Sequence, residues 1–103
     1  MRFLIKAVVP TEAANASIKA GTFVKNIQTA LESIKPEAVY FTETGGDRTA
    51  YLIVDIPSAS DIPSVGEPLY LALGGTVELM PVMLPEDLMK AQPAFEAAVR
   101  AFA

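Results

Sequence analysis

The sequence contains no cysteine, no histidine and no tryptophan. Without cysteine the chain has no disulfide, no thiol nucleophile and no thiolate ligand for zinc or an iron–sulfur cluster. Without histidine it lacks the commonest general base and the commonest transition-metal ligand. These absences exclude a hydrolase of the Ser-His-Asp type, and we expect neither a metal site nor a cofactor.

Basic residues and long apolar runs are also scarce. Eight Lys and Arg residues stand against twelve Asp and Glu residues, which gives a net charge of −4. A nucleic-acid-binding surface needs clustered basic residues to neutralise phosphates, and here they are scattered. The apolar run at 1–9 is too short to span a bilayer and has no cleavage site of small residues. The sequence therefore predicts a cytoplasmic protein that binds neither nucleic acid nor membranes.

Apolar residues, in contrast, are abundant for so short a chain. They make up 51% of the 103 residues, whereas charged residues make up 19%. A chain of this length forms one domain with one modest core, so 1–103 is expected to be a single domain. That core cannot enclose so many apolar side chains, and some must cover a partner or line a cavity. The composition therefore predicts a homodimer or a larger assembly.

The residue pattern predicts a series of short strands and helices. Alternating apolar residues indicate strands, spacings of three and four indicate helices, and Gly or Pro marks their ends. Thr11 is the expected N-cap of the first helix, with Asn15 and Ser17 as later alternatives, and Gly21 is expected to weaken that helix only slightly. Pro68 should break or kink the second helix, and Pro81 favours an edge position or a bulge for the last strand. The expected elements are a strand at 2–9, a helix at 11–34, strands at 38–44 and 48–56, a helix at 60–73, a strand at 76–84 and a helix at about 85–102.

This order of elements predicts an α+β domain. The sequence β-α-β-β-α-β is the ferredoxin-like arrangement, with strand order 4-1-3-2 and here with an extra C-terminal helix. Because side chains alternate across each strand, one sheet face is wholly apolar and should be covered by the helices. The other face mixes apolar with polar groups, and it is too apolar to stay wet and too polar for a core. We therefore expect this second face to close against the sheet of a partner around a partly polar interior.

Four polar side chains fall together on this second face. The glycine pair between the central strands predicts a hairpin in which Tyr40 faces Tyr51, and Lys6 can lie opposite both Tyr51 and Glu78. A partly desolvated Lys6 or Glu78 could act as a base or an acid, and a tyrosine hydroxyl could orient a substrate. The alternative is an ion pair and two aromatic residues at a dimer interface. Lys6, Tyr40, Tyr51 and Glu78 are therefore candidate ligand-binding residues.

The same register places Arg2 opposite Asp55 near the end of the sheet, as a second candidate pair. The two could clamp a polar ligand, and the alternative is a salt bridge at the rim of an interface. Glu43, Asp47 and Arg48 surround the hairpin turn, but they lack the spaced oxygen ligands of a calcium loop. Solvated turn charges are the better interpretation of these three.

Three stretches of the sequence carry a resemblance to a known superfamily. They are the opening strand at 2–10 (RFLIKAVVP), the hairpin at 44–48 (TGGDR) and the closing strand at 77–83 (VELMPVM), which PEDL follows at 85–88. With the long first helix, they resemble the dimeric α/β-barrel superfamily, which includes small GYD-domain-like, muconolactone-isomerase-like and antibiotic-biosynthesis-monooxygenase-like proteins. The resemblance implies that sheets from two chains meet as a barrel. It also implies that small apolar or aromatic molecules bind inside the barrel or between sheet and helices.

The chain departs from the enzymatic members of that superfamily, which often place His, Trp or Cys in their pockets. No catalytic residue is carried over. We therefore expect a homodimeric protein whose function is to bind a small apolar or aromatic metabolite in a pocket on the non-helix face of the sheet. One alternative is a cofactor-independent isomerase or monooxygenase-type enzyme that uses Lys6, Glu78 and a tyrosine. A second alternative is an assembly protein without a ligand.

Overall fold

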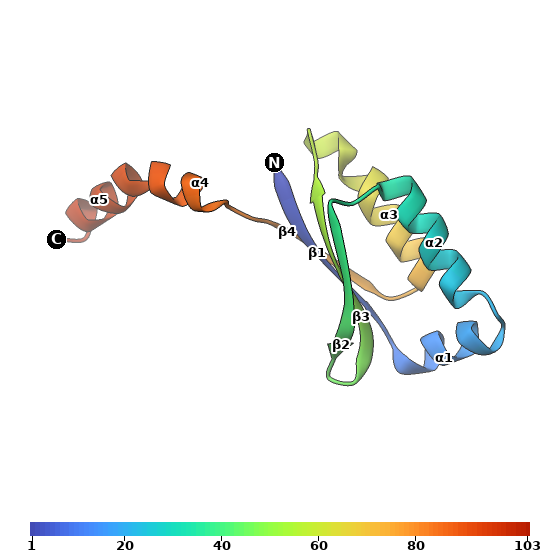
Figure 1. Ribbon diagram of the computed structural model, residues 1–103. Coiled ribbons are helices and arrows are strands. Elements are labelled where there is room, and N and C mark those ends of the chain that lie inside the picture. Colours follow the sequence, from blue (N-terminus) through green and yellow to red (C-terminus); the bar gives the residue numbers. More distant parts are fainter.

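The computed structural model describes all residues, 1–103, and contains one four-stranded antiparallel sheet. Its strands are β1 (Arg2–Val9), β2 (Ala38–Thr44), β3 (Asp47–Asp55) and β4 (Thr76–Pro81), which lie in the order β2-β3-β1-β4. Helices α2 (Phe23–Ile34) and α3 (Ile62–Leu73) lie together on one face of the sheet (Figure 1). The predicted α+β class, ferredoxin-like arrangement and strand order are confirmed.

Every polar pair that the sequence predicts is found in the register of the sheet. The hairpin register follows from Gly45 and Gly46, which have positive φ values of 58° and 90°. A two-residue turn with two left-handed residues twists in the same sense as its strands and therefore fixes their pairing. The observed pairs are Tyr40 with Tyr51, Lys6 with both Tyr51 and Glu78, and Arg2 with Asp55.

The hydrophobic core lies between the sheet and the helices α2 and α3. Ile5 on β1 and Leu52 on β3 are fully buried in it, and Val65 and Leu69 of α3 pack against the same cluster. Only 14 of the 103 residues are buried, whereas thirteen large apolar side chains are exposed. Most of the apolar excess of the sequence is therefore found outside the core.

No helix combines the length and the apolar character that a membrane span requires.

The first helical segment differs from the prediction at its start and in its middle. The sequence predicts one helix over 11–34, whereas the structure has two, α1 (Thr11–Lys19) and α2. Gly21 separates them because its φ of 76° lies in the left-handed region, where a helix ends. The predicted N-cap is wrong as well, since Pro10 holds that position. The hydroxyl and the amide of Thr11 instead donate to Asp47 Oδ1 at 2.7 and 3.0 Å, which ties α1 to the hairpin.

Two proline-containing elements also differ from the prediction. After a 3-10 turn at Ala59–Asp61, α3 continues past Pro68, so the break that the sequence predicts as one of two outcomes is absent. Proline removes one backbone donor, and the carbonyl left without it belongs to Ser64, which is exposed and can bind water. β4 lies at the sheet edge, as Pro81 predicts, but ends there and not at 84. Proline cannot donate to the ladder, and an edge position tolerates that loss.

The last segment leaves the sheet and its helices. The single predicted helix is replaced by α4 (Pro85–Lys90) and α5 (Gln92–Ala101), because Pro93 cannot donate to the preceding turn. Residues 85–103, which we term the C-terminal arm, project away from the rest of the molecule (Figure 1). The radius of gyration is 17.3 Å, whereas a compact chain of this length has about 13 Å. Every residue of the arm except Ala91 is exposed.

Candidate functional site

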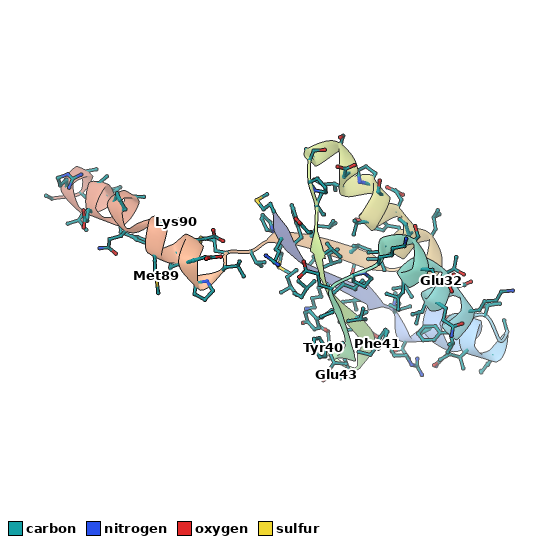
Figure 2. All side chains as sticks on the ribbon, turned by 45° about the horizontal axis from the view of Figure 1, so that its top comes forward. Glu32, Tyr40, Phe41, Glu43, Met89 and Lys90 are labelled. Carbon is teal, nitrogen blue, oxygen red and sulfur yellow. The ribbon has the colours of Figure 1, made fainter.

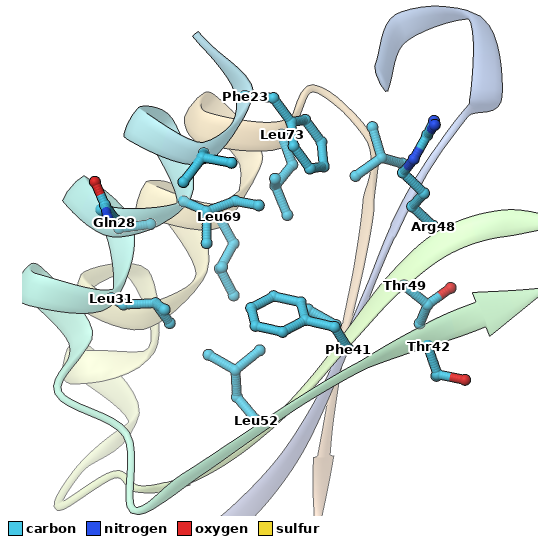
Figure 3. A pocket seen from close by; sticks show the side chains of 15 residues that line it. Phe23, Gln28, Leu31, Phe41, Thr42, Arg48, Thr49, Leu52, Leu69 and Leu73 are labelled. Carbon is cyan, nitrogen blue, oxygen red and sulfur yellow. The ribbon is translucent and has the colours of Figure 1, made fainter. Parts of the chain in front are cut away.

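A pocket of about 540 Å³ opens between α2 and the helix-facing side of the sheet. Its volume lies within the range of small-molecule sites, about 300–1,000 Å³. Apolar side chains from both layers form its walls, and Figure 3 shows them from close by. The lining residues that matter most are Phe23, Ala30 and Leu31 of α2, Phe41 of β2, and Ala50 and Leu52 of β3.

The pocket exists because small side chains line it where two layers meet. Ala50 on β3 and Ala30 on α2 are both buried, and both leave room that a larger residue would fill. In addition, α2 packs mainly on α3 and not on the outer strand β2. As a result Phe41 on β2 and Val24 on α2 border the pocket with 61% and 64% of their surface exposed. The space between the layers is therefore open to solvent on this side.

The threonines that border the pocket do not present their hydroxyls to it. The hydroxyls of Thr42 and Thr49 point away from the helices (Figure 3). The hydroxyl of Thr49 is held outside the pocket by Thr44 Oγ1 at 2.9 Å and by the carbonyl oxygen of Asp47 at 3.0 Å. These two residues therefore contribute only their apolar parts to the wall.

Two further polar residues stand at the rim. The amide group of Gln28 lies on the outer side of α2 (Figure 3). Arg48 Nη1 donates to Asn15 Oδ1 at 2.9 Å, so its guanidinium is held toward α1. The pocket thus offers shape and apolar contact to a ligand, with one cation at its edge and no acid or base within it.

The four candidate residues of the sheet lie on the other face, in one row across all four strands. Tyr51 and Lys6 at the centre of this row are half-buried, whereas Tyr40 and Glu78 at its two ends are exposed. The structure brings them side by side, but no hydrogen bond joins them, and Lys6 forms no ion pair with Glu78. The pocket includes none of the four. They can form an enclosed site only if another surface covers this face.

Arg2 and Asp55 lie opposite each other at the end of the sheet but bind other partners. Arg2 Nε donates to Glu37 Oε2 at 3.1 Å, and this hydrogen bond raises the pKa of Arg2 above its usual range. The Met1 ammonium donates to Asp55 Oδ1 at 2.8 Å and holds the pKa of that carboxyl below its usual range. A salt bridge between Arg2 and Asp55 is therefore absent, since each has a nearer partner. The sequence pattern does not indicate this contact, because the hairpin register continued past Ala38 would place Glu37 opposite Val54 and not beside Arg2.

The charges at the hairpin turn stabilise the turn and its neighbours. Glu43 Oε2 accepts the amide of Gly46 at 2.6 Å. Asp47 accepts two hydrogen bonds from Thr11, and Arg48 donates to Asn15. These groups are engaged in structural contacts, which agrees with the interpretation of them as turn charges.

The pocket itself is not predicted by the sequence pattern. Phe23 and Leu31 lie on the apolar side of α2, and Phe41 lies on the helix-facing side of β2. The periodicity of the sequence therefore predicts that all three are core residues. Periodicity gives the direction of a side chain, but the distance between two layers decides whether that side chain meets a neighbour. The sequence feature that could have indicated the pocket is the small size of Ala30 in the predicted helix and of Ala50 in the predicted strand that faces it.

Comparisons with known proteins bear on the fold. No protein-family model matches the chain, and no curated protein matches its sequence. Among solved structures, it is similar to 5-chloro-2-hydroxyhydroquinone dehydrochlorinase (TftG) from Burkholderia phenoliruptrix AC1100, solved in complex with 2,5-dihydroxybenzoquinone. The match covers 84% of this chain and 97% of that chain, with a TM-score of 0.60 and 17% sequence identity. At this identity the likeness shows the fold alone.

Proposed function

We propose that this protein binds a small, largely apolar molecule in the pocket between α2 and the sheet. One observation carries the proposal: the pocket has the volume of a ligand site, its walls are apolar, and the polar groups at its border point away. A ligand there gains affinity because apolar surface leaves water, at about 25 cal/mol per Å². Since no acid, base or nucleophile faces the space, binding without chemical conversion is the function that this geometry supports best.

The expected ligand is a flat ring compound with few polar substituents. Phe23 and Phe41 both line the pocket, and aromatic rings pack favourably with one another. A polar or acidic substituent would lie at the rim, where Arg48 supplies the positive charge. TftG, which shares the fold, was solved with a small flat ring compound, 2,5-dihydroxybenzoquinone.

The proposal is tested with 8-anilinonaphthalene-1-sulfonate (ANS), a ring probe with one acidic group, added to 15N-labelled protein. Binding should shift the amide signals of Ala30 and Ala50 most strongly. Ala50→Leu fills the space and should lower the affinity for ANS by about tenfold or more. Ala13→Leu makes the same enlargement at an exposed position of α1 and should leave the affinity unchanged. Equal affinity in the two variants would overturn the proposal.

We further propose that two copies associate through the face of the sheet that α2 and α3 leave open. Lys6 and Glu78 are neighbours on that face, so a two-fold interface can pair them between copies, with Tyr51 beside them. The association would also cover the half-buried apolar residues of this face, which are Leu4, Val8, Ile53, Met80 and Val82.

The association is tested by light scattering at micromolar concentration, which should report about twice the mass of one chain. A monomer would overturn the association.

The enzymatic alternative depends on the same face. If a second sheet encloses the half-buried Lys6 and Tyr51, Lys6 and Glu78 would act as base and acid, and Tyr40 or Tyr51 would orient the substrate. Arg2 and Asp55 would then lie at the rim of that site. Under this alternative, Lys6→Met and Glu78→Gln should abolish turnover of a substrate found by screening, while the dimer stays folded. Unchanged turnover in both variants would remove the alternative.

A further inference from the structure

We propose that the C-terminal arm packs on a second copy of this chain, passing the edge of that copy's sheet and reaching its helices. The inference rests on the association through the open sheet face proposed above. It assigns a role to a segment that neither that interface nor the pocket explains.

The arm is an amphipathic segment with nothing packed on its apolar side. Leu88, Phe95, Val99 and Phe102 follow one another at spacings of seven, four and three residues, which places them along one side of a helical path. Their exposed fractions are 47, 52, 72 and 92%. Met89 also points into open space from α4 (Figure 2). An apolar surface of this extent in a small protein marks a contact with another surface.

The start of the arm directs it away from its own helices. The amide of Val82 donates to the carbonyl oxygen of Arg2 at 3.0 Å, so the chain is still tied to β1 at this point. α4 begins almost at once, and Asp87 Oδ2 accepts the amide of Leu84 at 2.9 Å. So short a link leaves the arm little freedom to turn back. Figures 1 and 2 both show it on the side of the sheet opposite to α2 and α3.

A second copy on the open face would therefore lie beside the arm. Two packed sheets are about 10 Å apart. The six residues of α4 and the ten of α5 span about 24 Å at the rise of an α-helix. The arm is thus long enough to pass the partner's sheet and to continue along the partner's helices. Under two-fold symmetry each copy would hold the other in this way.

The area that the arm offers is close to what a stable dimer needs. A phenylalanine side chain buries about 150–250 Å², so Phe95 and Phe102 together offer on the order of 300 Å² at their present exposure. Leu88, Met89 and Val99 are also exposed and offer a comparable area. A standard interface buries about 800 Å² per partner. The arm would supply most of that area, and the open face of the sheet would supply the rest.

The first test is paramagnetic NMR between copies of the full-length chain, which has no cysteine of its own. Ala101→Cys carries a nitroxide in unlabelled protein, and this is mixed with 15N-labelled protein that has no nitroxide. Broadening then arises only between copies, and we expect it at amide signals of α2 or α3. If the mixture is dimeric by light scattering but shows no such broadening, the arm contact is overturned and the sheet-face dimer stands. A monomeric sample overturns both.

The second test places charge on the arm. Phe95→Asp combined with Phe102→Asp should weaken the dimer by about tenfold or more in sedimentation equilibrium, because buried aromatic residues dominate interfaces. The matched control, Ala97→Asp combined with Ala101→Asp, adds the same two charges on the opposite side of α5 and should leave the dissociation constant unchanged. Amide spectra of the sheet residues confirm that each variant is folded. An unchanged dimer in the double variant, or equal weakening by the control, would overturn the inference.

Discussion

Phe41 on β2 lies directly opposite the small Ala50 on β3, and the ring of Phe41 extends into the pocket that both residues line (Figure 3). A larger residue at position 50 would fill that space and turn this part of the molecule into ordinary core. Instead both residues line the pocket, and the ring of Phe41 is 61% exposed. The size of the side chain at position 50, beside the exposed ring of Phe41, therefore determines whether this part of the sheet has space for a ligand.

Phe41→Ala should weaken ANS binding by about tenfold, because the ring forms one wall of the pocket. The free energy of unfolding should fall by less than about 2 kcal/mol, since the cost of about 3–5 kcal/mol applies to buried aromatic residues. Calorimetric titration and urea denaturation measure the two quantities.

Tyr40 provides the matched control for Phe41. It is 68% exposed and points to the other side of β2 (Figure 2). Tyr40→Ala should leave the affinity for ANS unchanged. If both truncations weaken ANS binding equally, the probe binds somewhere other than the pocket.

Gly75 should tolerate no side chain, because a Cβ there would collide with the carbonyl group of Val8 in β1. Gly75→Ala should therefore lower the free energy of unfolding by about 3 kcal/mol or more, since the sheet would have to move. Gly66 in α3 is the control, where a Cβ would meet Leu79 Cδ1 at an ordinary 3.8 Å. Gly66→Ala should raise stability by about 0.5–1 kcal/mol through helix propensity. Shifts of the same sign in urea denaturation would contradict the close approach of Gly75 to β1.

Asp55 should titrate at lower pH than an ordinary aspartate, since the Met1 ammonium holds its pKa down by a hydrogen bond and by charge. A lowered pKa stabilises the folded state at neutral pH, and this contribution is lost as the pH falls below about 4. Acetylation of the Met1 amine should raise the pKa of Asp55 toward its ordinary value, as followed by NMR of the carboxyl carbon. Arg2→Gln removes a weaker influence and should raise the pKa less. A pKa that does not respond to acetylation would contradict the ion pair.

The sheet is predictable from the sequence because its determinants are local. Side chains alternate along each strand, and the two left-handed glycines of the hairpin fix the pairing of Tyr40 with Tyr51. The remaining pairs follow once the strand order is known. Helix interruptions are less predictable, because Gly21 ends a helix while Pro68 does not. Gly21 ends the helix through its own left-handed conformation, whereas Pro68 is tolerated because the carbonyl that loses its donor, that of Ser64, is exposed to water.

The pocket and the arm lie beyond what a sequence pattern can specify. An apolar stripe looks the same whether it meets a core, a ligand or another chain. Ala30 and Ala50 become pocket residues only because α2 packs on α3 and leaves the outer strand uncovered. Phe95 and Phe102 predict an apolar side for the last helix, but the pattern does not say that this side is exposed.

The most direct test of the pocket is a set of intermolecular NOEs between the ring protons of bound ANS and the methyl groups of the protein. If the pocket is the binding site, NOEs should reach the methyl groups of Leu31 and Leu52, which line it. Methyl groups of the other sheet face, such as those of Leu4 and Met80, should give none. NOEs confined to that face or to the C-terminal arm would contradict the proposed function.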